Sequence, residues 1–249
     1  MPRTIMVFDL ETRLDKSAVA RAYQLDEGDH AWATSVIGDK FPPLIFHEII
    51  CIGALRAVHS DGAWKVEALG APHSKERDEK NLISDFAVAI EKHRPKLVTF
   101  NGSSFDLPVL RYRGGLHQVF APGLYQQPYF HRYGDASTAL CDLLASYDGR
   151  GKVSLDVLCR TWNIPGKPGT IDGSQVAGFA GDGRFTEIAQ YCEHDVVATY
   201  KVWLRHELFA GRLTPEAFAR SEDALADYIF CAGKFHLHAF LAPRGTSSN

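Results

Sequence analysis

The chain has 249 residues, of which 45% are hydrophobic and 23% are charged, and its formal net charge is −3. This composition excludes a disordered chain and is enough for one large domain or two small ones around a sizeable core. The charge excludes a strongly basic protein that grips long stretches of nucleic acid, although an enzyme that holds a few nucleotides needs only a small basic rim.

Five cysteines are scattered along the chain, and none lies in a CxxC pair. This odd number predicts neither a disulfide framework nor a zinc site, and it is typical of a protein in the reducing cytoplasm. The first residues, MPRTIMVFDLET, reach acidic side chains too soon for the apolar core of a signal peptide. No apolar run is long enough to span a bilayer, so we expect no membrane partner.

The first predicted element is a buried strand at residues 4–8, an apolar, β-prone run that ends at Asp9. Residues 13–47 are polar and predict an insertion outside the core. Residues 49–58 and 63–69 are two more β-prone runs, and the Asp-Gly dipeptide between them predicts a hairpin.

Helix and strand alternate in the next segment. Residues 79–93 carry apolar side chains at helical spacing, and Pro95 ends that helix. Residues 97–100 predict a short buried strand, and residues 107–116 predict the helix that follows it. A strand, a hairpin, a helix, a strand and further helices indicate an α/β fold with a mixed sheet.

The second half of the chain is predicted to be mainly helical. Residues 154–162 form a short helix capped by Ser154, and residues 163–173 form a loop rich in Pro and Gly. Residues 186–208 predict a long helix, and residues 214–241 predict further helix.

Asp9 and Glu11 follow the first predicted strand, two residues apart. Residues i and i+2 of a strand point to the same face, so the two carboxylates project together beside a buried run. A divalent cation would relieve their repulsion and desolvation, and hard oxygen ligands favour Mg²⁺ or Mn²⁺. The alternative is a pair of solvated acids where a strand opens into a loop.

Asp106 lies beyond the carboxyl end of the predicted strand at residues 97–100, where α/β sheets tend to place their sites. An alternative role is the N-cap of the helix that follows. The neighbouring Phe105 is a candidate either for the core or for stacking on a nucleobase.

Tyr191 and Asp195 lie four residues apart on the long predicted helix and therefore share one face. Asp195 would complete a metal site, and the tyrosine hydroxyl would point at whatever the metal binds. The alternative is a tyrosine at the edge of a packed apolar stripe that includes Ile188 and Val196.

These motifs are far more specific together than singly. The order D-x-E from Asp9, N-x-x-x-F-D ending at Asp106 and Y-x-x-x-D ending at Asp195 resembles the exonuclease motifs of the DEDD superfamily. The tyrosine matches the DEDDy branch, because Gln190 stands where the other branch has histidine. FDLET and NGSSFD look most like the proofreading exonuclease domain of family B DNA polymerases. Residues 164–176 are similar to a stand-alone bacterial family related to that domain.

The resemblance implies a ribonuclease H-like fold, with a mixed five-stranded central sheet flanked by helices and with extra C-terminal helices. It implies an exonuclease domain at residues 1–210 that contains the insertion at 13–47. Residues 211–249 would form a helical extension packed on the same domain, with a short frayed tail. A chain of 249 residues leaves no room for a polymerase domain.

The resemblance also implies two divalent metal ions, Mg²⁺ or Mn²⁺, as cofactors. Asp9 would hold both ions and Asp106 the second one. Glu11 and Asp195 would hold the first. Tyr191 would orient the attacking water, since a phenol is a poor base at neutral pH.

The implied substrate is single-stranded DNA or a frayed 3′ end, and the implied product is a nucleoside 5′-monophosphate. Candidate contacts to the terminal nucleotides are Leu10, Thr12, Asn101 and Phe105. Two lysines near Gly-rich segments are candidates for contact with phosphate or for a solvated surface, namely Lys152 and Lys167.

Three alternatives stay open. An RNA 3′–5′ exonuclease would use the same acids and differ in contacts to the 2′-hydroxyl, while the likeness to a DNA proofreading domain favours DNA. A catalytically silent nucleic-acid-binding protein would be expected to lack one of the four acids, and all four are present. A small-molecule phosphohydrolase with the same metal pair is the third. The sequence does not predict the oligomeric state.

Overall fold

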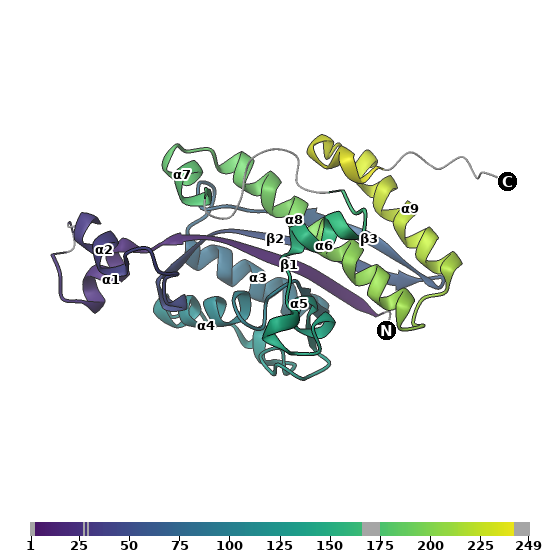
Figure 1. Ribbon diagram of the computed structural model, residues 1–249, viewed down its shortest axis with the longest axis horizontal. Helices are drawn as coiled ribbons and strands as arrows, with labels where there is room; N and C mark the ends of the chain where they lie inside the picture. The colour runs from purple at the N-terminus through teal and green to yellow at the C-terminus, as the bar shows by residue number, and fades with distance from the viewer. Residues whose placement is uncertain (1–2, 27, 29, 166–174, 242–249) are drawn as a thin grey trace.

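The computed structural model describes residues 3–26, 28, 30–165 and 175–241, and it is built on a five-stranded sheet of order β3-β2-β1-β4-β5 (Figure 1). The antiparallel half contains β1 (Thr4–Leu14), β2 (His47–Ser60) and β3 (Ala63–Gly70). The parallel half adds β4 (Lys96–Thr99) beside β1 and β5 (Ser137–Ala139) beside β4. This mixed sheet is the one expected of a ribonuclease H-like fold.

The helices of the described residues have the following bounds in chain order. They are α1 (Lys16–Ala22), α2 (His30–Ile37), η1 (Leu44–Phe46), α3 (Glu79–His93), α4 (Asp106–Leu116), η2 (Pro122–Tyr125), α5 (Leu140–Leu144), η3 (Gly149–Gly151), α6 (Leu155–Thr161), α7 (Val176–Gly181), α8 (Phe185–Phe209), α9 (Pro215–Cys231) and η4 (Phe235–Phe240). In this part of the chain, no helix combines the length and the apolar character that a membrane span requires.

Helices cover both faces of the sheet (Figure 1). On one face, α3 and α4 pack against Met6, Phe8 and Leu10 of β1. On the other face, α8 and α9 pack in a second core that includes Ile5 and Val7. The alternation of side chains along β1 therefore divides its residues between two cores.

β1 is longer than the sequence predicted. The expected strand ended at Asp9, but β1 continues to Leu14 because β2 pairs with it along its whole length, with an irregularity after Glu11. The parallel partner β4 is short and pairs only with residues 5–7 of β1. The second half of β1 therefore has a strand on one side only, and its other edge is open to side chains from elsewhere.

Local signals gave several elements correctly. In the predicted hairpin, Asp61 and Gly62 have φ values of 53° and 78°, the left-handed pair that a tight two-residue turn requires. The predicted helix at residues 79–93 is α3, and Ser154 caps α6 by accepting a hydrogen bond from the Val157 amide. The helix predicted at 214–241 is wrong in part, because Gly233, with φ of 63°, separates α9 from η4. Most of the predicted loop, residues 166–173, and the tail lie outside the described residues.

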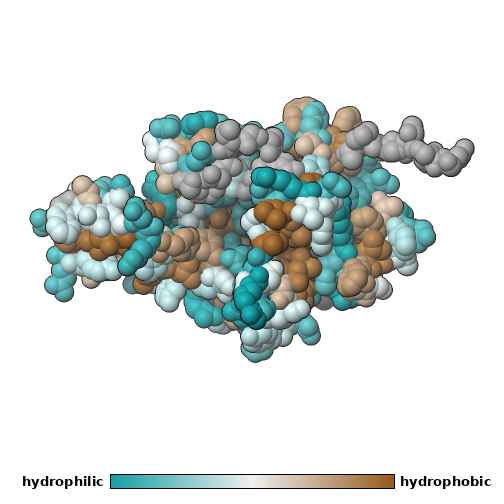
Figure 2. Space-filling view, viewed as in Figure 1, coloured by the Kyte–Doolittle hydropathy of each residue, from teal (hydrophilic) through white to brown (hydrophobic). Residues whose placement is uncertain are grey.

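Residues 13–47 contain more structure than their polarity suggested. Helices α1 and α2 project from one end of the sheet (Figure 1) and enclose a small apolar cluster made by Val19, Ala33, Ile37 and Phe46. In Figure 2, apolar side chains gather in the band between these helices. The two helices have only seven and eight residues, about two turns each, so no helical periodicity stood out in the sequence.

Candidate active site

A cavity of about 490 Å³ lies beside the second half of β1, next to the segment that follows β4. Nine of the eleven candidate residues from the sequence line it. They are Asp9, Leu10, Glu11, Thr12, Asn101, Phe105, Asp106, Tyr191 and Asp195. The four acids come from β1, α4 and α8, so the fold brings together side chains that are far apart along the chain.

Asp9 and Glu11 continue the side of β1 that carries Ile5 and Val7, and this side faces α8. Oxygen atoms of the two carboxylates and the sulfur of Cys192 on α8 lie within 4.8 Å of one another. The strand geometry therefore holds the two acids side by side, as their spacing predicted.

Gly53 allows α8 to approach this part of the sheet. It lies opposite Asp9 in the ladder between β1 and β2. A Cβ atom at position 53 would lie 2.6 Å from the Cys192 sulfur and 3.1 Å from a methyl carbon of Val196. An isolated glycine within a strand is a known sign of close backbone approach, but this role was not predicted for Gly53.

Asp106 is the first residue of α4, and its Oδ1 accepts a hydrogen bond of 3.1 Å from the Leu10 amide of β1. The alternative role as N-cap is wrong, because Phe105 occupies the N-cap position and makes no side-chain cap. The bond to Leu10 is possible because β4 ends before it reaches this part of β1. Burial raises the pKa of the Asp106 carboxyl to about 7, so a nearby cation would favour its ionised form.

Tyr191 and Asp195 project from one face of α8 into the cavity. Burial raises the pKa of the Tyr191 phenol well above its ordinary value, and the negative charges of Asp195, Glu11 and Asp9 raise it further. The phenol therefore keeps its proton and acts as a hydrogen-bond donor in this cavity.

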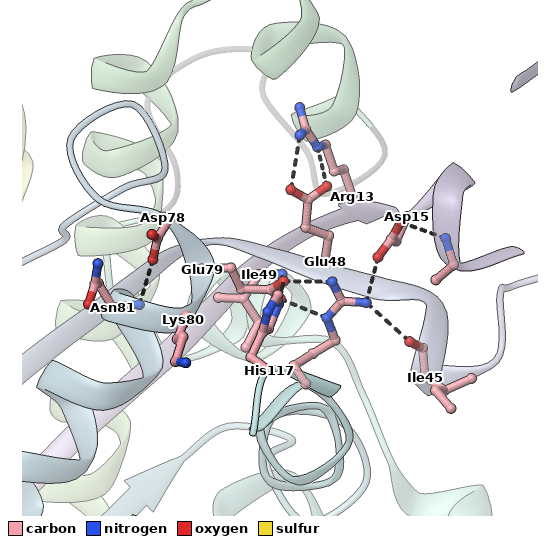
Figure 3. Close-up of polar contacts among 12 residues, drawn as sticks. Arg13, Asp15, Ile45, Glu48, Ile49, Asp78, Glu79, Lys80, Asn81 and His117 are labelled. Atoms are coloured by element: carbon pink, nitrogen blue, oxygen red, sulfur yellow. Dashed lines mark hydrogen bonds and ion pairs between the residues drawn. The ribbon is translucent and has the colours of Figure 1, made fainter. Parts of the chain in front are cut away.

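The cavity lining is rich in negative charge. Among its described residues there are four carboxylates, and Arg13 is the one lysine or arginine. The Arg13 guanidinium is already engaged by Glu48, with bonds of 2.7 and 3.0 Å (Figure 3). Such a collection of buried like charges favours the binding of a cation.

The donor atoms select the kind of cation. Burial raises the pKa of the Cys192 thiol well above its ordinary value, so the thiol is neutral. It donates a hydrogen bond of 3.6 Å to the carbonyl oxygen of Asp9. A neutral thiol is a poor metal ligand. The remaining donors are carboxylate oxygens, which suit Mg²⁺ or Mn²⁺ and disfavour zinc.

Aromatic side chains line the cavity beside the acids. Phe41 and His47 have ring centroids 4.9 Å apart, and His47 meets Phe105 edge-on at 5.1 Å. The hydroxyl of Thr12 lies 2.9 Å from Nδ1 of His47, so this candidate contact residue is also part of the wall of the cavity. Phe41 and His47 were not among the predicted site residues, because they lie in the segment that was predicted to be an insertion.

Of the two lysine candidates, Lys152 does not line this cavity in the described part of the chain. Lys152 forms an ion pair with Asp142, which also binds Arg132, and this pairing fits neither a free phosphate contact nor a fully solvated side chain. Lys167 lies outside the described residues.

A family described as a predicted 3′–5′ exonuclease related to the exonuclease domain of PolB matches residues 39–244, which is most of the chain. No curated protein matches the chain. The family match includes Asp106, Tyr191 and Asp195 and begins after Asp9 and Glu11. The first two acids are thus joined to the matched region by the geometry of the cavity.

Proposed function

The chain belongs to the family of predicted 3′–5′ exonucleases related to the exonuclease domain of PolB, and from that premise we propose that it removes nucleotides one at a time from the 3′ end of single-stranded DNA or of a frayed DNA end. The products would be nucleoside 5′-monophosphates. The observation that carries the proposal is the convergence of four carboxylates from β1, α4 and α8 on one cavity.

Two divalent cations, Mg²⁺ or Mn²⁺, are the proposed cofactors. When bound, they would supply the positive charge that activates water and stabilises the departing 3′ oxygen. Asp9 would hold both ions, and Glu11 and Asp195 would hold the first ion together with Asp9. Asp106 would hold the other. The oxygen-only donor set and the scarcity of cationic side chains in the lining support this assignment.

The protein's own groups would orient the reactants. Tyr191 keeps its proton because burial and three neighbouring carboxylates oppose its ionisation, so its O–H would donate to the attacking water and fix its position. The amide of Leu10 holds the Asp106 carboxylate in place through a hydrogen bond. Asn101 and Phe105 would contact the terminal nucleotides through hydrogen bonding and stacking respectively.

A digestion experiment tests this proposal. A 3′-tailed DNA and an RNA of the same sequence, each labelled at the 5′ end, are incubated with the protein and Mg²⁺, Mn²⁺ or EDTA. We expect a ladder shortened from the 3′ end of the DNA with either metal, release of mononucleotides and no reaction in EDTA.

The other outcomes are equally informative. Faster shortening of the RNA would replace DNA by RNA as the substrate, because the four acids serve either polymer. Shortening from the 5′ end, or full activity in EDTA, would contradict the proposed chemistry. An absence of hydrolysis with every metal would contradict the proposed function as a whole.

A further inference from the structure

Phe41 exposes a large apolar ring at the wall of the cavity. Its side chain is 70% exposed although it lines the cavity with the acids. Single exposed aromatic residues are ordinary on protein surfaces, and Phe230 on α9 is 75% exposed without lining this cavity. Phe41 differs because it stands against other rings at the place where a nucleic-acid strand would bind.

Phe41, His47 and Phe105 form one group, which we call the aromatic wall. The ring centroid of Phe41 lies 4.9 Å from that of His47 and 6.1 Å from that of Phe105. His47 and Phe105 meet at 90° with their centroids 5.1 Å apart. His47 is buried and Phe105 is partly buried, so Phe41 presents the most exposed ring of this group.

Hydrogen bonds of His47 fix the position of Phe41. The Pro42 carbonyl can only accept, so His47 donates to it through Nε2 at 3.1 Å. Nδ1 of the neutral ring then accepts from the Thr12 hydroxyl at 2.9 Å. His47 thus ties the residue next to Phe41 to β1, immediately beyond Glu11. The exposed ring is therefore held in a defined position relative to the acids.

Resting on the proposed function, we propose that Phe41 stacks on a nucleobase at the 3′ end of the substrate, in addition to the contact proposed for Phe105, and that His47 positions it. Stacking accepts all four bases because each base has an aromatic face. It also favours single strands, since a base inside a duplex has both faces covered by its neighbours. The aromatic wall would therefore recognise an unpaired 3′ end without reading its sequence.

The first test measures base binding without hydrolysis. An oligonucleotide with 2-aminopurine at its 3′-terminal or penultimate position is titrated with protein in EDTA, and fluorescence quenching reports stacking. We expect Phe41→Ala to weaken or abolish the quenching at one of these positions, Phe41→Trp to retain it and the matched control Phe230→Ala to behave as wild type. Equal quenching by Phe41→Ala and wild type at both positions would overturn the proposal.

The second test uses the reaction. With natural single-stranded DNA we expect Phe41→Ala to lower kcat/KM roughly tenfold, mainly through KM, because one base-stacking contact is lost. With abasic residues in place of the two terminal nucleosides, wild type and Phe41→Ala should be equally slow. The proposal would be wrong if Phe41→Ala lost the same factor on both substrates or lost nothing on natural DNA.

A double-mutant cycle tests the positioning role of His47. His47→Ala should lower kcat/KM on natural DNA in the same way as Phe41→Ala. The double variant should have the same kcat/KM as Phe41→Ala alone. Additive losses, or an equal loss on abasic DNA, would show that His47 acts in another way. If wild type binds DNA and quenches 2-aminopurine but hydrolyses nothing, the proposed function fails while the stacking inference survives.

Discussion

Two regions of the molecule bury carboxylates in opposite surroundings. Glu79, at the start of α3, is 7% exposed, and Glu11, in the cavity, is 6% exposed. Glu79 accepts bonds of 2.7 and 2.6 Å from Arg113 and one of 2.7 Å from the Ile49 amide, and it lies 2.6 Å from His117 (Figure 3). In the cavity, by contrast, the described lining offers four carboxylates and a single arginine.

The difference separates a structural acid from a candidate catalytic one. The charge of Glu79 is neutralised from within the chain, and Arg113 also pairs with Asp15 at the start of α1, so the network joins the α1–α2 projection to the core. The cavity instead accumulates charge of one sign, which a ligand from solution would neutralise. Burial of an acid alone therefore does not indicate a functional site, whereas the charge of the neighbouring side chains does.

The largest expected effect concerns the cavity. Asp9→Asn removes one of the clustered charges and an oxygen donor, so we expect hydrolysis to slow by roughly 1,000-fold, as on loss of a key electrostatic stabiliser. The melting temperature without metal should stay the same or rise, because repulsion is relieved. Single-turnover digestion of 3′-labelled DNA and thermal unfolding measure the two quantities. Near-normal turnover would show that Asp9 is not part of the active site.

A substitution of Glu79 should have the reverse effect of Asp9→Asn, since it should lower stability and leave activity nearly unchanged. Glu79→Gln leaves the buried Arg113 guanidinium with only part of its neutralising charge, so we expect a loss of about 3 kcal/mol in the free energy of unfolding. Activity per folded molecule should change little. Urea denaturation, followed by an assay of the native fraction, separates the two effects.

A surface pair provides the control for Glu79. Glu67 forms an ion pair with Arg56 and is much more exposed, so Glu67→Gln should cost less than about 1 kcal/mol. If both variants lost the same stability, the distinction between the buried network and an ordinary surface pair would not hold.

Gly53 should affect both stability and activity, because α8 packs against it and also carries residues of the cavity. The Cβ of Gly53→Ala would press on Cys192 and Val196, so we expect a loss of about 2 kcal/mol in stability from overpacking. Displacement of α8 should also lower activity, since Tyr191 and Asp195 lie on that helix. Gly70→Ala is the matched control, because nothing lies within 4 Å of a Cβ there. Equal behaviour of the two variants would contradict the role given to Gly53.

Apart from the control variants, the smallest expected effect comes from Tyr191→Phe. Loss of one hydrogen bond to the attacking water, worth about 1.4 kcal/mol, would slow the reaction about tenfold. Metal affinity, measured by calorimetry, should not change, because the phenol is not a proposed ligand. A variant with weakened metal binding would argue against a role in orienting water.

The sequence by itself determined the features that depend on a few neighbouring residues. The bounds of α3 follow from helical spacing and from Pro95, and the β2–β3 turn follows from Asp-Gly, because these preferences act within one or two turns of chain. The i, i+2 and i, i+4 rules likewise placed Asp9 with Glu11 and Tyr191 with Asp195 on common faces.

Only the tertiary structure decided the features that depend on which distant segments meet. β1 extends past Asp9 because β2 supplies its partner, and Asp106 bonds to Leu10 because β4 stops short. Phe41 reaches the cavity because His47 holds the segment before β2 against Thr12. Such contacts join residues tens of positions apart, and no local preference of one segment specifies the side chains that another segment will bring to it.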